Sequence, residues 1–249
     1  MDDIGKYEQS IKDKLRQKRN ITGVDYNILL KKFFIDEFLR VLSKSKYSSN
    51  FVWKGGFVLS AITGIQTRTT VDIDTMLSGV TVNIESLTKI MQSITGTSNQ
   101  NYIKYRLMGI ESIQEEKEYA GLRIKIESQL GNINEEFHLD VATGEKLIPS
   151  EIEWEYKPII GNDTIRIMIY RPERILAEKL QTLLERGLLN TRMKDFYDIY
   201  IIPKFAPIDF TILSEAFSVV MKERGSLNQW NRRNRLLLMI KNDKVMNDL

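Results

Sequence analysis

Cysteine is absent from this chain of 249 residues, and histidine occurs once, at His138. Disulfides and thiolate zinc sites are therefore excluded, and so is a zinc site built from several histidines. A nucleophilic mechanism of the Ser-His-Asp type would depend on His138 alone. Any bound metal must be held mainly by oxygen atoms, which favours Mg²⁺ or Mn²⁺.

Long apolar runs are also missing. No stretch approaches the roughly 20 apolar residues that a membrane-spanning helix needs, and residues 1–6 lack the apolar core of a signal peptide. Together with the lack of cysteine, these absences lead us to expect a cytoplasmic protein with no membrane partner. Charge is nearly balanced, with 36 basic and 33 acidic residues, so net charge alone does not argue for nucleic-acid binding.

Basic residues nevertheless gather in two places. One is the segment 12–19, and the other is the C-terminal group Lys222, Arg224, Arg232, Arg233 and Arg235. Such clusters are typical of solvated helix faces, and they are also typical of an electrostatic track for a phosphate backbone. The sequence leaves both interpretations open.

The apolar periodicity divides the chain into a mixed first part and a helical second part. It predicts helices over 25–43, 57–62 and 83–95, and strands over 51–53, 71–77, 102–107, 122–127, 136–141 and 164–170. After Pro172 it predicts helices over 172–186, 192–202, 210–224 and 227–240. Residues 3–19 are predicted as an exposed helix or a loosely attached arm. We therefore expect an α/β (α+β) fold, with a mixed sheet and helices over 1–170 and a helical domain over 171–249.

Two acidic residues and a pair of glycines form the most informative pattern. Gly55-Gly56 follows a short apolar strand, and Asp72 and Asp74 occur at i and i+2 in a later β-type run. Alternate residues of a strand share a face, so the two carboxylates lie on the same side of the sheet. Such a pair can hold one or two hard cations, and the glycines let the backbone come close to a phosphate ligand. The pattern therefore indicates a metal-assisted phosphate site.

A phosphoryl or nucleotidyl transfer site built on two metal ions usually needs a third carboxylate from a neighbouring strand. Asp140 is the candidate, because it is an acid within an otherwise apolar β-run. The alternative is a structural ion pair between Asp140 and a nearby cation such as Arg123 or Lys125. His138 is interpreted as a flanking strand residue rather than as a catalyst.

Other sites that use Asp-x-Asp fit the sequence less well. A calcium-binding EF-hand loop would need glycine at position 77 and glutamate at position 83, where the chain has Leu77 and Asn83. A Walker A loop would need a Gly-Lys-Ser/Thr ending, which Gly55-Gly56 lacks. A manganese-dependent glycosyltransferase remains a rival, although the long series of βα units that precedes the motif in such folds is missing.

Four short motifs, in order over residues 50–200, resemble those of the AbiEii/AbiGii-type nucleotidyltransferase toxin family. The first two are Gly55-Gly56-Phe57-Val58-Leu59 and, after twelve residues, Asp72-Ile73-Asp74, with Arg68 and Thr70 at positions that are often basic and hydroxylated in the family. The third, Ala177-Glu178-Lys179-Leu180, resembles the lysine motif, and the fourth, residues 192–199, resembles the closing (R)-x-(K/R)-D-x-x-D motif. The chain departs from the family pattern at Phe57, where Ser or Thr is usual.

The resemblance implies a role for each matched residue. Asp72 and Asp74 would hold the metal ions, with Asp140 as third ligand or as base for the incoming hydroxyl. Lys179 would contact the triphosphate, and these four residues form the predicted catalytic set. Asp195 and Asp198 would lie near the site or orient Lys179 and Arg192. The predicted nucleotide-binding set is Lys54, Gly55, Gly56, Arg68, Thr70, Lys179, Arg192, Lys194, Asp195 and Asp198.

The resemblance further implies transfer of a nucleoside monophosphate from an NTP, with Mg²⁺ or Mn²⁺, at a site between the two domains. The family implies a toxin of a toxin–antitoxin or phage-defence (abortive infection) system, with a cognate antitoxin as partner. RNA is the preferred acceptor, because some relatives act on the 3′ end of tRNA. Two alternatives stay open: nucleotidylation of a small molecule such as an antibiotic, and a non-catalytic NTP-binding module that acts through a partner.

Overall fold

The computed structural model of the chain describes residues 2–66, 70–96, 102–113, 121–142, 147–187, 193–231 and 233–242. The chain divides into two compact units. The first unit comprises Met1–Lys146 and Ile152–Ile169, and the second comprises Leu147–Glu151 and Tyr170–Leu249. The sequence placed a boundary near residue 170; the observed division falls between residues 169 and 170 and also assigns residues 147–151 to the helical unit.

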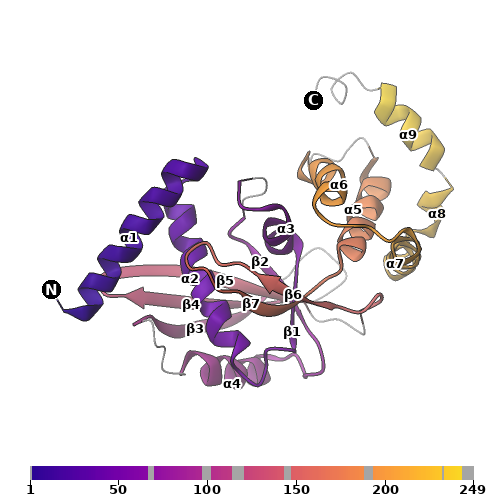
Figure 1. Cartoon of the computed structure of the whole chain (residues 1–249). Coiled ribbons are helices and arrows are strands. Elements are labelled where there is room, and N and C mark those ends of the chain that lie inside the picture. The colour runs from indigo at the N-terminus through magenta and orange to yellow at the C-terminus, as the bar shows by residue number, and fades with distance from the viewer. Residues whose placement is uncertain are drawn as a thin grey trace. The chain divides into compact units, whose positions relative to one another are not determined.

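A seven-stranded mixed sheet forms the centre of the first unit (Figure 1). Its strands are β1 (Phe51–Lys54), β2 (Ile73–Leu77), β3 (Lys104–Ile113), β4 (Gly121–Leu130), β5 (Ile133–Ala142), β6 (Ile152–Tyr156) and β7 (Ile165–Ile169). They follow the order β3-β4-β5-β2-β1-β7-β6. The pairs β2–β5 and β1–β7 are parallel, and the other neighbours are antiparallel. The expected α/β fold with a mixed sheet is thus confirmed.

The helices of the first unit are α1 (Asp3–Thr22), α2 (Tyr26–Ser43), α3 (Gly55–Thr63) and α4 (Ile84–Thr95). Three of them begin at an Asp or Asn whose side chain accepts a hydrogen bond from a backbone N–H of the first turn: Asp2, Asp25 and Asn83. The helix α2 contributes much of the core, because Phe33, Phe34 and Phe38 are fully buried. The ring of Phe38 packs edge-on against Phe137 of β5, with centroids 5.5 Å apart, so α2 covers the face of the sheet to which Phe137 points.

The N-terminal segment is a packed helix rather than a loose arm. Ile11 and Leu15 of α1 are buried, and Glu8 accepts a hydrogen bond of 3.1 Å from the backbone N–H of Asn132 at the β4–β5 turn. The hydrogen bond from Lys12, together with that from Asn132, lowers the pKa of Glu8. The segment is therefore tied to the sheet by apolar burial and by a charged contact.

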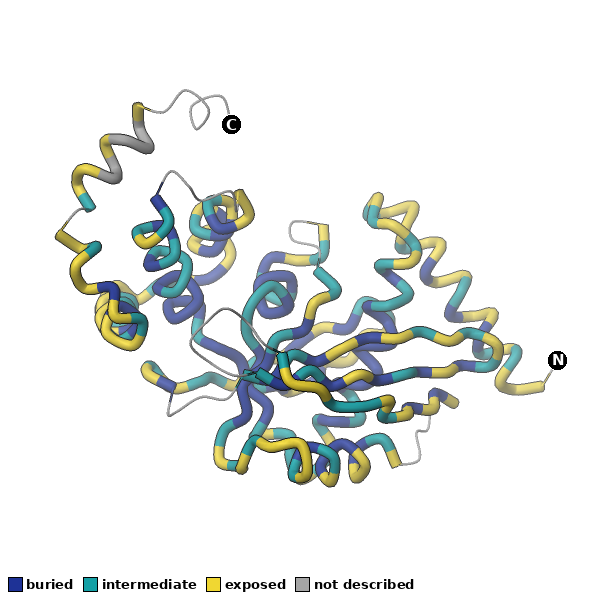
Figure 2. Tube along the Cα trace, turned by 180° about the vertical axis from the view of Figure 1, so that it is seen from behind, coloured by how far each residue is buried: buried dark blue, intermediate teal, exposed yellow. Residues whose placement is uncertain are grey.

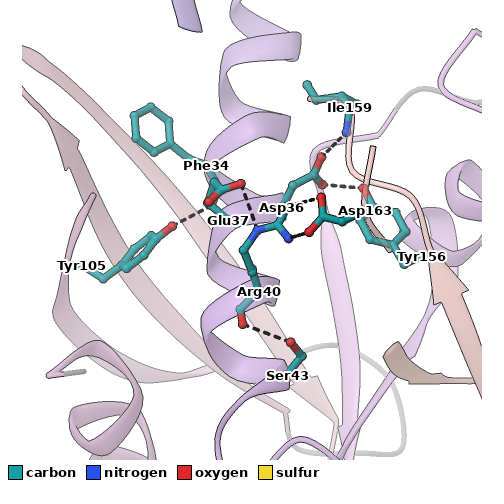
Figure 3. A network of polar contacts seen from close by, with 9 residues as sticks. All are labelled: Phe34, Asp36, Glu37, Arg40, Ser43, Tyr105, Tyr156, Ile159 and Asp163. Carbon is teal, nitrogen blue, oxygen red and sulfur yellow. Dashed lines mark hydrogen bonds and ion pairs between the residues drawn. The ribbon is translucent and has the colours of Figure 1, made fainter. Parts of the chain in front are cut away.

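A buried polar network ties α2 to the β6–β7 hairpin (Figure 3). Asp36, which is 1% exposed, accepts hydrogen bonds from Lys32 Nζ (2.9 Å), from the Tyr156 hydroxyl and from the Ile159 N–H (2.7 Å). The Lys32 ammonium also lies 4.5 Å from the ring centroids of Phe57 and Tyr156. Burial, together with the Asp36 charge and hydrogen bond, raises the pKa of Tyr156 well above its usual value. The Asp36 carboxylate thus compensates a buried cation.

The second unit consists of α5 (Pro172–Arg186), α6 (Met193–Phe205), α7 (Phe210–Glu223), α8 (Leu227–Trp230) and α9 (Arg233–Asn242). Its small core contains Ala177, Ala216 and Val220, while many other residues of its helices are exposed (Figure 2). None of the helices in the described segments is long and apolar enough to cross a membrane.

The single helix expected over residues 227–240 is wrong, because α8 ends at Trp230 and α9 begins at Arg233. The Trp230 ring packs on Phe217 (centroids 5.3 Å apart), and the Arg233 guanidinium lies 4.4 Å from the Trp230 centroid. Arg233 also donates to the Trp230 carbonyl. We attribute the break to these contacts, which hold Trp230 against α7.

Replacing Asp36 with alanine is predicted to lower the free energy of unfolding by about 3–5 kcal/mol, because the buried Lys32 ammonium loses its carboxylate. Urea denaturation measures the change. Glu85→Ala is the matched control: it removes a carboxylate that pairs with Lys89 on the surface, where the side chains are 79% and 72% exposed, and it should cost less than about 0.5 kcal/mol. Equal effects of the two substitutions would contradict a structural role for the network.

Candidate functional site

Gly55 lies directly against Asp74, and Gly56 lies beside Thr70, whose hydroxyl binds the backbone of Asp72. Gly55 begins α3 with φ +63°, and a Cβ added to it would lie 2.3 Å from Asp74 Oδ2. A Cβ on Gly56 would lie 3.2 Å from Thr70 Oγ1, and that oxygen accepts a hydrogen bond of 3.2 Å from the Asp72 N–H. Glycine is therefore needed at position 55 for both its backbone angle and the space it leaves. The turn and the acids form one local structure.

The strand that carries the acids begins later than predicted. The expected strand covered residues 71–77, but β2 starts at Ile73, so Asp72 lies in the segment immediately before it. Asp72 is exposed, whereas Asp74 is half-buried within the strand. The two carboxylates therefore have different backbone environments: Asp72 lies just before the strand, and Asp74 lies within it.

A row of five charged residues crosses five neighbouring strands. The register aligns Glu111 of β3 with Arg123 of β4, and Arg123 with Asp140 of β5. Asp140 is aligned with Asp74 of β2, and Asp74 with Lys54 of β1. Aligned residues on neighbouring strands are about 4.8 Å apart at the backbone. Two carboxylates thus stand side by side, flanked by a cation on each side, and like charges in adjacent positions are destabilising unless something compensates them.

Arg123 binds the Asp140 carboxylate with two hydrogen bonds. Its Nε donates to Oδ1 and its Nη2 to Oδ2, each at 2.7 Å. The hydrogen bond with Asp140, and the charges of Asp140, Glu111 and Asp72, raise the pKa of Arg123. The structural ion pair, which was the alternative to a catalytic role for Asp140, is therefore present. Asp140 also lies next to Asp74, as a role in the site requires.

Sequence reasoning named Arg123 only as a possible partner, but the chain contains a signal that would have found it. Gly131 and Asn132 form a two-residue hairpin turn between β4 and β5, with Leu130 paired to Ile133. Counting back from that turn in antiparallel register places residue 123 opposite residue 140. The alignment of Asp140 with Asp74 has no such local signal, because it depends on parallel pairing of distant segments.

The acids fit a hard cation by their chemistry, with carboxylate oxygen as the donor. Within the described parts of the chain, no three Asp, Glu, His or Cys side chains are grouped so as to hold a metal ion. Asp74 is the acid that lies against the glycine turn, Asp72 precedes it by two residues, and Asp140 pairs with Arg123. Mg²⁺ is usually held by one or two carboxylates with substrate phosphates and water completing its shell, and a two-carboxylate donor set meets that requirement.

The second unit contains a separate charged cluster. Lys179 of α5 binds two acids of α6, with Nζ 2.5 Å from Asp195 Oδ1 and 2.9 Å from Asp198 Oδ2. The acids are nearly inaccessible, with side chains 8% and 0% exposed, while that of Lys179 is 21% exposed. Lys194, next to this cluster in sequence, is exposed.

The structure thus places the predicted residues in two groups. The first unit brings together Lys54, Gly55, Gly56, Thr70, Asp72, Asp74 and Asp140, and the second unit brings together Lys179, Asp195 and Asp198. Arg68 and Arg192 lie outside the described residues. That both groups serve one site stays a prediction.

The profile of one protein family, described as the nucleotidyl transferase AbiEii toxin of type IV toxin–antitoxin systems, matches residues 37–246. This chain belongs to the AbiEii nucleotidyl transferase toxin family. The resemblance seen in the motifs is thereby confirmed, and membership of the AbiEii family implies an antitoxin partner. No curated protein matches the chain.

Several solved structures are similar to this AbiEii member. JHP933 from Helicobacter pylori is 14% identical, with 91% of this chain and 85% of that chain covered and a TM-score of 0.49. An antigenic nucleotidyltransferase-like protein from Paracoccidioides brasiliensis is 15% identical, with coverages of 78% and 91% and a TM-score of 0.45. The antibiotic-resistance factor ANT(2'')-Ia is 15% identical, with coverages of 84% and 100% and a TM-score of 0.46. The AbiEii assignment depends on the family profile and not on these likenesses.

Replacing Gly55 with alanine is predicted to destabilise the protein by more than the same change at Gly23. Both glycines have positive φ, +63° and +71°, so each substitution carries a strain of about 1–2 kcal/mol. Only at Gly55 does the new methyl group collide with Asp74, whereas nothing lies within 4 Å of a Cβ at Gly23. Urea denaturation measures both variants, and equal losses would contradict the close approach between turn and acid.

Replacing Lys179 with methionine is predicted to destabilise the protein by about 3–5 kcal/mol, because two buried carboxylates lose their cation. Adding Asp195→Asn and Asp198→Asn should restore most of that loss, because the amides carry no charge. Nucleotide affinity, measured by titration calorimetry, should stay weak in the triple variant if Lys179 also contacts the triphosphate. Full recovery of affinity with stability would restrict Lys179 to a structural role.

Proposed function

We propose that this AbiEii member is a metal-dependent nucleotidyltransferase that transfers NMP from an NTP to an RNA acceptor. The observation that supports this most directly is the placement of Asp74 between the Gly55 turn and Asp140. An adjacent pair of carboxylates is electrostatically unfavourable by itself, and a cation bound there would offset the repulsion. The glycine turn beside it makes room for the Asp74 carboxylate, and its backbone N–H groups are the candidates to bind a phosphate.

Each residue of the proposed site has a defined task. Asp72 and Asp74 would hold Mg²⁺ or Mn²⁺, a group that, when bound, would supply positive charge against the phosphates and the attacking hydroxyl. Lys179 binds triphosphate oxygens as a point charge. Asp140 would serve as third ligand or as base; each of its oxygens accepts one hydrogen bond from Arg123 and keeps a second lone pair for that role.

The reaction balances as a displacement at the α-phosphorus. A hydroxyl oxygen of the acceptor bonds to that phosphorus, while the bond from the same phosphorus to the oxygen that bridges it to the β-phosphate breaks. Pyrophosphate leaves with the electron pair, and the hydroxyl proton passes to a carboxylate, for which Asp140 is the candidate. The products are a nucleotidylated acceptor and pyrophosphate.

The acceptor and the biological setting are proposed from the family. AbiEii members are toxins, and modification of the 3′ end of tRNA would explain toxicity by blocking translation. We accordingly propose tRNA as acceptor, a cognate antitoxin as the partner that neutralises the activity, and a role in phage defence. Nucleotidylation of a small molecule, and NTP binding without transfer, are the outcomes that a transfer assay separates from this one.

The test incubates the protein with each α-³²P-labelled NTP, Mg²⁺ or Mn²⁺, and either tRNA or total RNA. Label on RNA supports the proposal, and EDTA should abolish it. Asp74→Asn is predicted to lower transfer by at least about 100-fold, because a neutral amide is a weaker ligand than a carboxylate for a hard cation, while the melting temperature should stay close to that of the wild type because the amide keeps the shape of the side chain. Label on small molecules only, nucleotide binding without transfer, or full transfer by Asp74→Asn would contradict the proposal.

A further inference from the structure

The helix α6 presents two opposite faces with different chemistry. Its inner face carries Asp195 and Asp198, which are 5% and 0% exposed and hold Lys179. Its outer face carries Met193, Tyr197, Tyr200 and Lys204, which recur at intervals of four, three and four residues and so form one stripe along the helix. The three apolar members of this α6 stripe are 38%, 41% and 62% exposed, in that order.

The charge on the outer side of α6 is entirely positive. The two acids of the helix are buried, while Lys194 and Lys204 are exposed. Lys204 Nζ lies 3.6 Å from the centroid of the Tyr200 ring, which places a cation on the face of an exposed aromatic ring. A partner for this surface must therefore supply negative charge together with flat groups that can stack on tyrosine.

We propose that the α6 stripe binds single-stranded RNA, with bases stacked on Tyr197 and Tyr200 and the phosphate backbone beside Lys194 and Lys204. Aromatic rings interleaved with cations are the means by which proteins hold single strands. The two tyrosines are separated by about 4.5 Å along the helix axis, which allows consecutive bases to engage them. A protein partner is less favoured, because lysine is depleted from the centre of protein interfaces and Lys204 lies directly on the exposed Tyr200 ring.

The inference deepens the proposed function, because it identifies which part of the chain holds the RNA acceptor. The same helix supplies the two acids that bind Lys179. A strand bound to the outer face of α6 is therefore held by the element that positions the lysine motif on its inner face.

The test measures binding without chemistry. A fluorescent single-stranded 12-nucleotide RNA with a blocked 3′ end is titrated with the full-length protein in the absence of NTP, and anisotropy gives the Kd. Tyr200→Ala is expected to weaken binding about tenfold or more, and Tyr200→Phe should keep it, because phenylalanine retains the stacking face. Lys204→Ala should reduce the salt dependence of binding by about 0.7 in the slope of log K against log salt.

The matched control is Phe210→Ala, which removes a ring that is 79% exposed at the start of α7, outside the stripe. It should bind RNA as the wild type does. Absence of binding by the wild type, unchanged affinity of Tyr200→Ala, or an equal loss in Phe210→Ala would overturn the inference and leave the exposed tyrosines to a protein partner. Weaker RNA binding by Tyr200→Ala supports the inference even if the wild type transfers no nucleotide to RNA, and that combination would reject only the proposed reaction.

Discussion

The register of β2 between β1 and β5 is the constraint on which the arrangement of the first unit depends. It places Asp74 next to Asp140 on one side and next to Lys54 on the other. Because side chains alternate along a strand, a slip of one residue would turn Asp74 toward the α2 side of the sheet and bring an apolar residue into the charged row. Trp53 and Leu139, neighbours of the charged residues on their strands, are buried. Because Trp53 and Leu139 are buried on one face of the sheet, the charged residues next to them in sequence must lie on the other face.

The glycine turn is supported from the core. Phe57, which replaces the small hydroxyl residue usual in the family, is 1% exposed and packs against Trp53 and Tyr156, with ring centroids 5.7 and 5.4 Å away. Its ring also lies against the buried Lys32 ammonium, whose charge Asp36 compensates. The departure from the family pattern is thus accommodated by a cation–aromatic contact in the core, and the segment after Gly56 is anchored by α2 and the β6–β7 hairpin.

Local patterns in the sequence are sufficient to predict most helices, most strands and the residues of the glycine–aspartate motif. What the patterns left undecided or missed depends on distant contacts: α1 is the expected exposed helix, but it is attached to the sheet through Asn132, and the single helix expected over 227–240 is broken where Trp230 meets Phe217. Lys32 and Asp36 illustrate the same limit. In sequence they form an ordinary i, i+4 surface pair, and only Tyr156, 124 residues from Lys32, reveals that they are buried. Periodicity reports which face of an element is apolar, but not what covers it.

Each unit contains an ion pair that engages a residue of the proposed reaction. In the first unit, Arg123 occupies both oxygens of Asp140. In the second, Lys179 is bound by Asp195 and Asp198. In the proposed reaction, a metal ion at Asp140 would have to share that carboxylate with the Arg123 cation, and a triphosphate at Lys179 would have to draw the ammonium away from two carboxylates. Each ion pair would therefore oppose the binding of its own ligand, because separating charges that already satisfy each other is costly.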